Sequence, residues 1–469
     1  MNTTFGACSK TFLTRLTPLY WAGVFAAYVL LSRDWAVVRA TSTTQEHLFG
    51  LFGFCVFFAI LYAAYTDYRS LSAPSLRNLI LIGLPFFVCL FMLAAVAELS
   101  QKSWDYKQYE AAFRAAAAGD NPYRSTRYLY PPFFAETMIA VYRLGGVLLP
   151  WIGMETGEAS LWMFVFYIHQ SALLFALLCS YHLSLRFAET AGLNPLTRVF
   201  FVSGLFLFNV PVLRTILYNQ VNFYILVSLL LPVVALNRRP FLSGAAIAAG
   251  GLIKLYPFAL VAPLLATQKW KVLTGVLAGC VFIVALGTNL FRDLTLWKQF
   301  ILFYLSFPVE RESAWFRNSS ILSFLRNLLD ILRAPDVALT PLFGLIAISI
   351  LGWIALRFFQ RERLYAPSPA DFTPAAGNVS PRDIGHLMDF SVLSLLIAPS
   401  AWEHHYVLAI PLAIWAFALS RRTSPGLLVV ALTFVFIMPV FNVFPLSYLR
   451  TAGLILLLVL TSPKKASVG

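Results

Sequence analysis

The side chains of this sequence that could do chemistry occur as short polar groups at the edges of long apolar runs. They are Asp105, Gln220 and Asn222, Lys254 and Tyr256, Arg317 and Asn318, and Glu403 with His404 and His405. Ionisable groups beside a hydrocarbon layer are costly to keep there, so each is a functional candidate by default. A carboxylate can accept a proton from a hydroxyl group, and a lysine or arginine can bind a phosphate. These groups form one site only if the chain places them on the same side of a membrane.

The composition predicts a membrane protein. Hydrophobic residues make up 59% of the 469 residues and charged residues 12%, against about 45–50% and about 25% in soluble proteins. The mean hydropathy is +0.75. A soluble fold of this composition would lack a polar surface. We therefore expect an all-α, polytopic membrane protein with a single integral membrane domain over residues 1–469.

Charge and cysteine content exclude several other classes of protein. The net charge is +14, but Lys and Arg lie in small groups between apolar runs, which is typical of cytoplasmic loops and not of a nucleic-acid-binding face. No nucleic-acid partner is therefore expected. The five cysteines form no CxxC pair and lie mostly inside apolar runs, which excludes a disulfide framework or a cysteine zinc site. We expect no cofactor and no divalent metal.

The apolar runs give the number of membrane spans. A helix needs about 20 apolar residues to cross the hydrocarbon, so the runs predict about 12–14 transmembrane helices. The predicted spans are about 17–32, 47–65, 78–98, 160–184, 198–217, 221–236, 272–290, 340–358, 387–401, 406–420, 425–442 and 446–461. Two further runs, 241–254 and 256–267, are short and interrupted by glycines and Pro257. They are either two short spans or a broken, re-entrant pair, which is tolerated only where protein or a cavity covers the backbone.

The basic residues between the spans give an orientation. A cytoplasmic N-terminus places most of these residues in the cytoplasm, as the positive-inside rule expects. Two long segments, 99–159 and 291–339, then face outward with juxtamembrane helices, whereas 359–386 is a polar cytoplasmic loop without its own fold. We place 131–150 along the outer face, because one more crossing would put the following basic groups outside. All the candidate groups then lie on the outer side, expected to be the periplasmic side of a bacterial inner membrane.

Motifs spread from about residue 100 to 420 resemble those of a known enzyme family. They are Asp105 with Tyr109, Gly119 with Asn121-Pro122-Tyr123, Tyr130-Pro131-Pro132, Gln220-Val221-Asn222, Ile253-Lys254-Leu255-Tyr256-Pro257, Asn318-Ser319-Ser320 and Trp402-Glu403-His404-His405. In type and order they resemble glycosyltransferase family 87, whose members are polytopic GT-C enzymes related to polyprenyl-phosphate-mannose-dependent alpha-1,2-mannosyltransferases. The sequence departs from the family pattern in two ways. Asn219 stands where the family usually has Gly, and three apparent spans precede Asp105 where one is commoner.

The resemblance implies a role for each candidate group. Asp105 would accept the proton of the acceptor hydroxyl, and a histidine of the pair His404 and His405 would share that role or polarise the acceptor. Lys254 and Arg317 would bind the donor phosphate. The predicted sugar- or acceptor-binding residues are Gln220, Asn222, Asn318, Tyr256 and Glu403.

Simpler structural roles remain open for the same residues. Asp105 could cap the helix expected near Tyr106, because Asp is a common helix cap. Lys254 could extend to the membrane interface, and Arg317 could pair with Glu310 or Glu312. Backbone carbonyls could hold the two histidines, and Gln220 and Asn222 could satisfy a broken backbone.

The expected activity is transfer of a sugar, mannose by resemblance, from a polyprenyl-phosphate donor to a glycan or glycolipid acceptor among membrane lipids. Direct displacement would invert the anomeric centre. One alternative is a secondary transporter, which would also have many spans and broken helices. Another is a membrane acyltransferase that depends on His404 or His405.

Overall fold

The computed structural model describes residues 74–99, 101–126, 128–306, 318–365, 379–439, 441 and 443–463. The expected spans 17–32 and 47–65, and Arg317, lie outside the described residues. Within those residues every regular element is a helix, and the one isolated β-bridge joins Asn318 to Trp402. The predicted all-α, polytopic fold is confirmed.

The helices are distributed along the whole described chain. They are α3 (Pro74–Leu99), α4 (Trp104–Ala117), α5 (Pro122–Ser125), α6 (Pro132–Trp151), α7 (Glu158–Thr190), α8 (Pro195–Leu207), α9 (Val210–Leu217), α10 (Asn222–Ala235), α11 (Pro240–Ile253), η1 (Tyr256–Leu260), α12 (Val261–Ala266), α13 (Trp270–Gly287), α14 (Thr295–Ser306), α15 (Ile321–Leu332), η3 (Asp336–Ala338), α16 (Leu339–Leu364), α17 (Pro381–Ile397), η4 (Glu403–Ala409), α18 (Ile410–Ser420), α19 (Pro425–Leu432), η5 (Thr433–Ile437), η6 (Leu446–Tyr448) and α20 (Leu449–Leu460).

Many helix starts follow local capping signals in the sequence. The side chains of Ser103, Asn121, Asn194, Asn209 and Ser380 each accept a hydrogen bond from a backbone N–H in the first turn of the following helix. In four of these five helices a proline occupies one of the first two positions, where its missing N–H costs no hydrogen bond. Short polar caps thus divide a nearly continuous apolar sequence into separate helices.

Five described helical segments are long and apolar enough to cross a membrane. They are Ile80–Leu99, Pro132–Trp151, Glu158–Thr190, Trp270–Gly287 and Leu339–Leu364. The predicted span 198–217 is the pair α8 and α9, which is bent by 48° and would make a sixth span. Within the described residues, the other predicted spans correspond to shorter helices, and 17–32 and 47–65 lie outside those residues. By length and composition α6 is also suited to cross, although we expected 131–150 to lie along the outer face.

The chain is broken between α11 and η1, as its glycines and Pro257 suggest. Lys254 follows α11 with an extended backbone (φ −152°, ψ 123°), and a 3₁₀ turn begins at Tyr256. Gly250 allows this segment to approach α10, because a Cβ at that position would lie 2.1 Å from Oγ of Ser228. The break leaves Lys254 on an irregular segment between two apolar helices.

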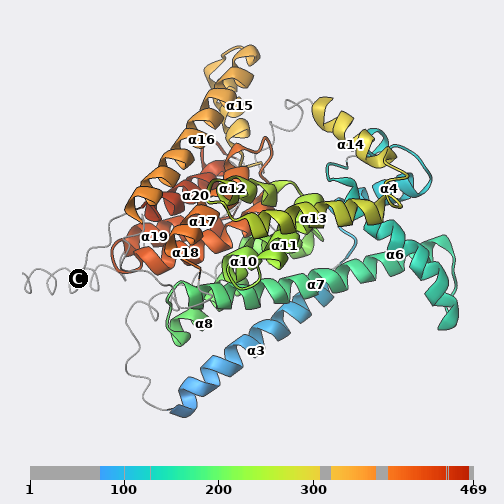
Figure 1. The fold of residues 1–469 in the computed structure, drawn as a ribbon, viewed down its shortest axis with the longest axis horizontal. Helices are drawn as coiled ribbons and strands as arrows, with labels where there is room; N and C mark the ends of the chain where they lie inside the picture. Colours follow the sequence, from blue (N-terminus) through green and yellow to red (C-terminus); the bar gives the residue numbers. More distant parts are fainter. Residues whose placement is uncertain are drawn as a thin grey trace, which may run out of the picture.

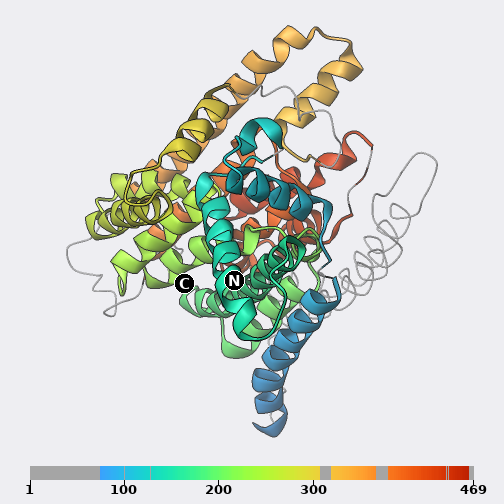
Figure 2. The same cartoon turned by 90° about the vertical axis from the view of Figure 1, so that its right-hand side faces the viewer.

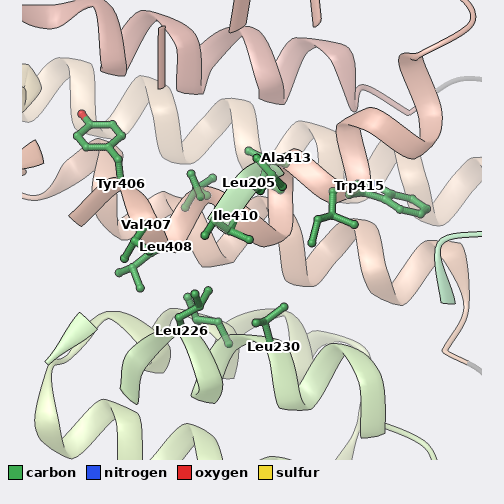
Figure 3. Close-up of a cluster of buried hydrophobic side chains, with 14 of the residues drawn as sticks. Leu205, Leu226, Leu230, Tyr406, Val407, Leu408, Ile410, Ala413 and Trp415 are labelled. Carbon is green, nitrogen blue, oxygen red and sulfur yellow. The ribbon is translucent and has the colours of Figure 1, made fainter. Parts of the chain in front are cut away.

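The largest core surrounds the C-terminal helices, and Figure 3 shows part of it. Its residues include Leu205 of α8, Leu226 and Leu230 of α10, and Val407, Leu408, Ile410 and Ala413 of η4 and α18. Nearly all of α18 is buried. This packing fixes the position and orientation of η4, which carries the two histidines.

A second, mainly aromatic core lies beneath α4. It contains Tyr106, Phe113, Tyr128, Phe134 and Phe166, all buried. Edge-to-face pairs join Tyr106 to Phe166 and Phe113 to Phe134, with ring centroids 4.8 Å and 5.3 Å apart; such pairs are favourable beyond their buried area. These contacts hold the helix of Asp105 against α6 and α7.

Some elements extend from the body of the molecule. Helices α15 and α16 form a hairpin that projects upward in Figures 1 and 2, and α3 projects on the opposite side in both views.

The segment predicted as an unstructured loop, 359–386, was predicted wrongly at its ends. Helix α16 continues to Leu364, where Arg361 pairs with Asp389 of α17, and α17 begins at Pro381, where Asp383 pairs with Lys269.

Candidate active site

The start of α4 is tied to the loop between α9 and α10. Ser103 caps α4 by accepting from the N–H of Tyr106 at 3.1 Å, and its hydroxyl donates to the carbonyl of Tyr218 at 2.8 Å. Its backbone N–H donates to Oδ1 of Asn219 at 3.0 Å. Asp105 is therefore not the cap, and the capping alternative is wrong. The carboxylate lies in the first turn of α4, facing this loop.

The Asp105 carboxylate is held by a neutral amide. Nε2 of Gln220 donates to Oδ2 of Asp105 at 2.5 Å. Oε1 of Gln220 accepts from the hydroxyls of Tyr109 at 2.7 Å and Tyr130 at 3.3 Å. Because an ionised carboxylate only accepts, the amide NH₂ faces Asp105, and the amide oxygen faces the two tyrosine hydroxyls, which can donate to it. The two hydroxyls are themselves 2.9 Å apart. Asp105 itself stays partly exposed.

Opposing influences act on the acidity of Asp105. Burial raises the pKa of its carboxyl above the ordinary value, while the hydrogen bond from Gln220 and the charge of Lys254 act to lower the pKa. The charge of Glu403 acts in the same direction as burial. A carboxylate with a raised pKa is a stronger base than an ordinary Asp once it is ionised.

Asn219 has a backbone conformation that explains its residue type. Its φ is +52°, in the left-handed region that glycine adopts freely and that Asn tolerates best among residues with a Cβ. The departure from the family motif, Asn for Gly, thus keeps the same backbone turn. The turn directs Gln220 toward Asp105, and Asn222 begins α10 on the side of Lys254.

Lys254 points into the protein and not to the interface, so the interfacial alternative is wrong. Its Nζ donates to Oδ1 of Asn222 at 3.2 Å and lies 2.7 Å from Nε2 of His405. It also lies over the rings of Tyr130 and Tyr256, 5.4 Å and 5.0 Å from their centroids, a favourable position for a cation. Its hydrogen-bonding partners are uncharged side chains, so its charge remains available to an anion.

The two histidines take different directions. Nε2 of His405 accepts from Nζ of Lys254 at 2.7 Å, and its Nδ1 lies 3.2 Å from the backbone nitrogen of Trp402 and 3.4 Å from the hydroxyl of Tyr256. The backbone carbonyl of His404 accepts from Nδ2 of Asn222 at 3.0 Å, while its ring packs against Tyr218. The rings are perpendicular. Only His405 therefore joins the Lys254 side chain, and His404 contributes its backbone.

Glu403 is bound by an arginine that sequence reasoning missed. Nε of Arg214 lies 2.9 Å from Oε1 of Glu403, with both side chains buried, and Nη1 of Arg214 donates to the hydroxyl of Tyr218 at 2.7 Å. A single Arg inside the apolar run Val210–Leu217 was the available signal. The pair joins η4 to α9.

Most of the predicted sugar-binding residues are buried and form hydrogen bonds or ion pairs within the protein. Gln220, Asn222, Asn318 and Glu403 are 3%, 0%, 0% and 2% exposed. Oδ1 of Asn318 accepts from the N–H of Ala401 at 2.8 Å, and its Nδ2 donates to the carbonyl of Pro399 at 3.3 Å. These bonds help to position the site, and the contact of these four residues with a sugar or acceptor stays a prediction. Tyr256 is partly exposed, and its contact with a sugar stays a prediction.

Two further predictions are not decided by the geometry. Arg317 lies outside the described residues, so its phosphate contact stays a prediction. Among the described part of the chain, no group of three or more His, Cys, Asp or Glu side chains could hold a metal ion. Metal independence also stays a prediction.

Four segments far apart in sequence thus meet around Asp105 and Lys254: 103–109, 218–222, 254–256 and 402–405. Residues 128–370, more than half of the chain, match the family model of glycosyltransferase family 87. The chain belongs to glycosyltransferase family 87. A search of curated proteins and a search of solved structures gave no match.

Family membership fixes the general activity. The chain is a membrane glycosyltransferase of the GT-C type, with a sugar donor and an acceptor. The transporter and acyltransferase alternatives are thereby set aside. The matched range contains Gln220, Asn222, Lys254 and Tyr256 but neither Asp105 nor the histidines, which enter the site through their contacts in the fold.

Proposed function

We propose that this glycosyltransferase moves one mannose-type sugar from a polyprenyl phosphate to a hydroxyl of a glycan or glycolipid acceptor. Asp105 acts as general base, the anomeric centre is inverted, and the reaction takes place at the periplasmic face of an inner membrane. One observation carries the proposal: a partly exposed carboxylate and a buried lysine lie in one cluster, each hydrogen-bonded by neutral side chains.

Asp105 suits the base role because its hydrogen-bonding partner is not a cation. A direct ion pair would stabilise the carboxylate and weaken it as a base. The amide of Gln220 instead orients the group through Oδ2 while Asp105 stays partly exposed. The acceptor hydroxyl would transfer its proton to the carboxylate as its oxygen attacks the anomeric carbon.

Lys254 suits the leaving phosphate. As the bond from the sugar to the phosphate breaks, negative charge grows on the phosphate oxygen, and a fixed cation lowers the energy of that state. Asn222, His405 and the two tyrosine rings hold Nζ in place without neutralising it. Attack opposite the phosphate inverts the anomeric centre, so a beta-linked donor gives an alpha product. The apolar outer surface of the helices would accommodate the lipid chain.

The test uses purified protein in lipid nanodiscs and a panel of polyprenyl-phosphate sugars, with mannose first. Release of polyprenyl phosphate and formation of glycosylated acceptor are both measured. Asp105→Asn should lower kcat by at least about 10²-fold, the usual contribution of a general base, while donor binding is kept. Right-side-out membrane vesicles should glycosylate an acceptor that cannot cross the membrane.

Asp120→Asn is the matched control. Asp120 lies exposed in the turn after α4, so removing its charge should leave transfer unchanged. Wild-type turnover by Asp105→Asn would contradict the base role. Absence of transfer with every polyprenyl-phosphate donor would contradict the donor class.

A further inference from the structure

His169 is a buried histidine that belongs to none of the sequence motifs. It lies on α7 and is 0% exposed. Its Nε2 lies 3.0 Å from the carbonyl oxygen of Asn219, and the hydroxyl of Tyr224 lies 3.2 Å from its Nδ1. A carbonyl only accepts, so Nε2 carries the ring proton and donates it to Asn219. The hydrogen bonding therefore determines the tautomer of the ring.

The His169 ring also contacts the helix that carries Asp105. It stacks on the ring of Tyr106, with centroids 5.4 Å apart and planes 26° from parallel. Phe134 of α6 packs at 5.6 Å. The imidazole therefore contacts Tyr106, which follows Asp105 in sequence, and Asn219, which precedes Gln220. Through these two neighbours it can affect the hydrogen bond between Asp105 and Gln220.

Asn219 is the point where these contacts meet. Its carbonyl is bound by His169, its Oδ1 accepts from the N–H of Ser103, and its φ is +52°. A residue with a Cβ is strained in that conformation and keeps it only where its surroundings hold it. The next residue is Gln220, whose amide binds Asp105. Loss of the bond from His169 would release the turn that aims Gln220.

We propose that His169 is a positioning residue for catalysis, which holds the Asn219 turn and thereby the Gln220 amide against Asp105. The inference rests on the proposed base role of Asp105. It requires that the Nε2 proton, and not the volume of the ring, supplies the function. A ring that merely fills the core would be replaced equally well by any side chain of similar size.

Three substitutions separate these two roles. In His169→Gln the amide nitrogen takes the place of Nε2, whereas in His169→Asn it takes the place of Nδ1 and cannot reach Asn219. His169→Phe keeps the ring and removes the donor. His182→Phe is the matched control, because His182 is exposed on the same helix.

The kinetic expectation follows from the geometry. His169→Phe and His169→Asn should lower kcat by about tenfold or more, since small misplacements at an active site are costly. The donor KM should stay within about twofold, because ground-state binding is not removed. His169→Gln should recover most of kcat, and His182→Phe should behave as wild type. Thermal unfolding of each purified variant shows what fraction is folded, and kcat is expressed per folded protein.

The pH profile gives a second readout that a purely structural role would not change. The hydrogen bond from Gln220 lowers the pKa of Asp105, while the charges of Lys254 and Glu403 also face the carboxyl and are unchanged by these variants. Weakening the Gln220 bond should therefore raise the pKa of Asp105. Because the ionised form is the base, the acid limb of kcat/KM should move to higher pH in His169→Phe and return in His169→Gln.

Three outcomes would overturn the inference: equal kcat in His169→Asn and His169→Gln, wild-type kcat in His169→Phe, or an unshifted acid limb. If His169→Phe does not fold, the comparison of the Asn and Gln variants decides the matter. Failure of the proposed function is recognised separately. Active Asp105→Asn would refute the base role, whereas inactive Asp105→Asn beside wild-type His169→Phe would refute only the role of His169.

Discussion

Two clusters of charged residues in this molecule use similar side chains in different ways. The Arg357 cluster joins α16, α17 and α20 and consists of Arg357, Arg361 and Asp389, whose side chains are 2–3% exposed. Asp389 accepts from Nη2 of Arg357 at 2.7 Å and from Nη1 of Arg361 at 2.9 Å. Arg357 also donates to the carbonyl of Leu458 at 2.7 Å. In this cluster arginines bind both carboxylate oxygens.

The Asp105 cluster consists of Asp105, Tyr109, Gln220, Lys254 and His405, and its charges are not directly paired. Asp105 is hydrogen-bonded by an amide, and Lys254 by an amide and an imidazole. The segment 398–405, which ends in His405, follows the C-terminal end of α17, whereas Asp389 lies in the middle of that helix. The comparison teaches that ions paired with opposite charges stabilise the fold, while ions held by neutral groups stay available to a reacting proton or phosphate.

The largest expected effect concerns the Arg357 cluster. Asp389→Ala leaves two buried guanidinium groups without their carboxylate, and breaking a buried pair in this way typically costs about 3–5 kcal/mol. The free energy of unfolding of the purified protein should fall accordingly, as measured by thermal or denaturant unfolding. Asp105→Asn should change it by less than about 1 kcal/mol, because it replaces a partly exposed group.

A triple variant sharpens this prediction. Arg357→Met, Arg361→Met and Asp389→Leu together remove all three charges, and such apolar replacement of a buried network is often close to neutral. The triple variant should therefore be more stable than Asp389→Ala alone. A triple variant as unstable as Asp389→Ala would show that the charges themselves, and not the unpaired arginines, account for the loss.

The second largest effect is expected at Lys254, where a substitution should lower the activity without lowering the stability of the fold. Lys254→Met removes the cation expected at the leaving phosphate and should lower kcat by about 10²–10³-fold, the usual cost of one electrostatic contact to the transition state. The fold should be as stable as wild type or more stable, because a buried cation without a carboxylate is itself costly. Lys107→Met, at an exposed position of α4, is the control for both measurements. Loss of stability as large as in Asp389→Ala would assign Lys254 to the scaffold.

The sequence predicted the parts of the site that are carried by local motifs. Asp105, Lys254, Gln220 and His405 were each singled out as polar groups at the edges of apolar runs, and they do meet in the fold. The turn at Asn219 could be expected from its residue type, because Asn tolerates positive φ. What the sequence could not give was the direction of each side chain. Asn318, for example, hydrogen-bonds to the backbone at Ala401 and Pro399.

The missed residues have partners far away in the chain. His169 lies 50 residues from Asn219, and Arg214 lies in an apolar run that suggested only a span. Arg361 was counted among the cytoplasmic loop charges, yet it is 3% exposed and pairs with Asp389. Periodicity and composition describe the environment of a residue, but a contact between distant helices is fixed by packing that no local pattern encodes.

The smallest expected effect tests whether the neutral partner of Asp105 matters. Gln220→Leu removes the hydrogen bond that lowers the pKa of Asp105, while burial still raises it. The pKa of the carboxyl should therefore rise further, and because the ionised form is the base, activity should be lost at a higher pH than in wild type as the pH falls. The pH dependence of kcat/KM measures this shift, with Gln101→Leu at an exposed position as control. At a pH well above the limb Asp105 is ionised, but turnover should stay about tenfold below wild type, as in His169→Phe, because the carboxylate is no longer oriented. An unshifted limb would mean that Gln220 does not bind the ionised carboxylate, and the contrast with Asp389 would then rest on Lys254 alone.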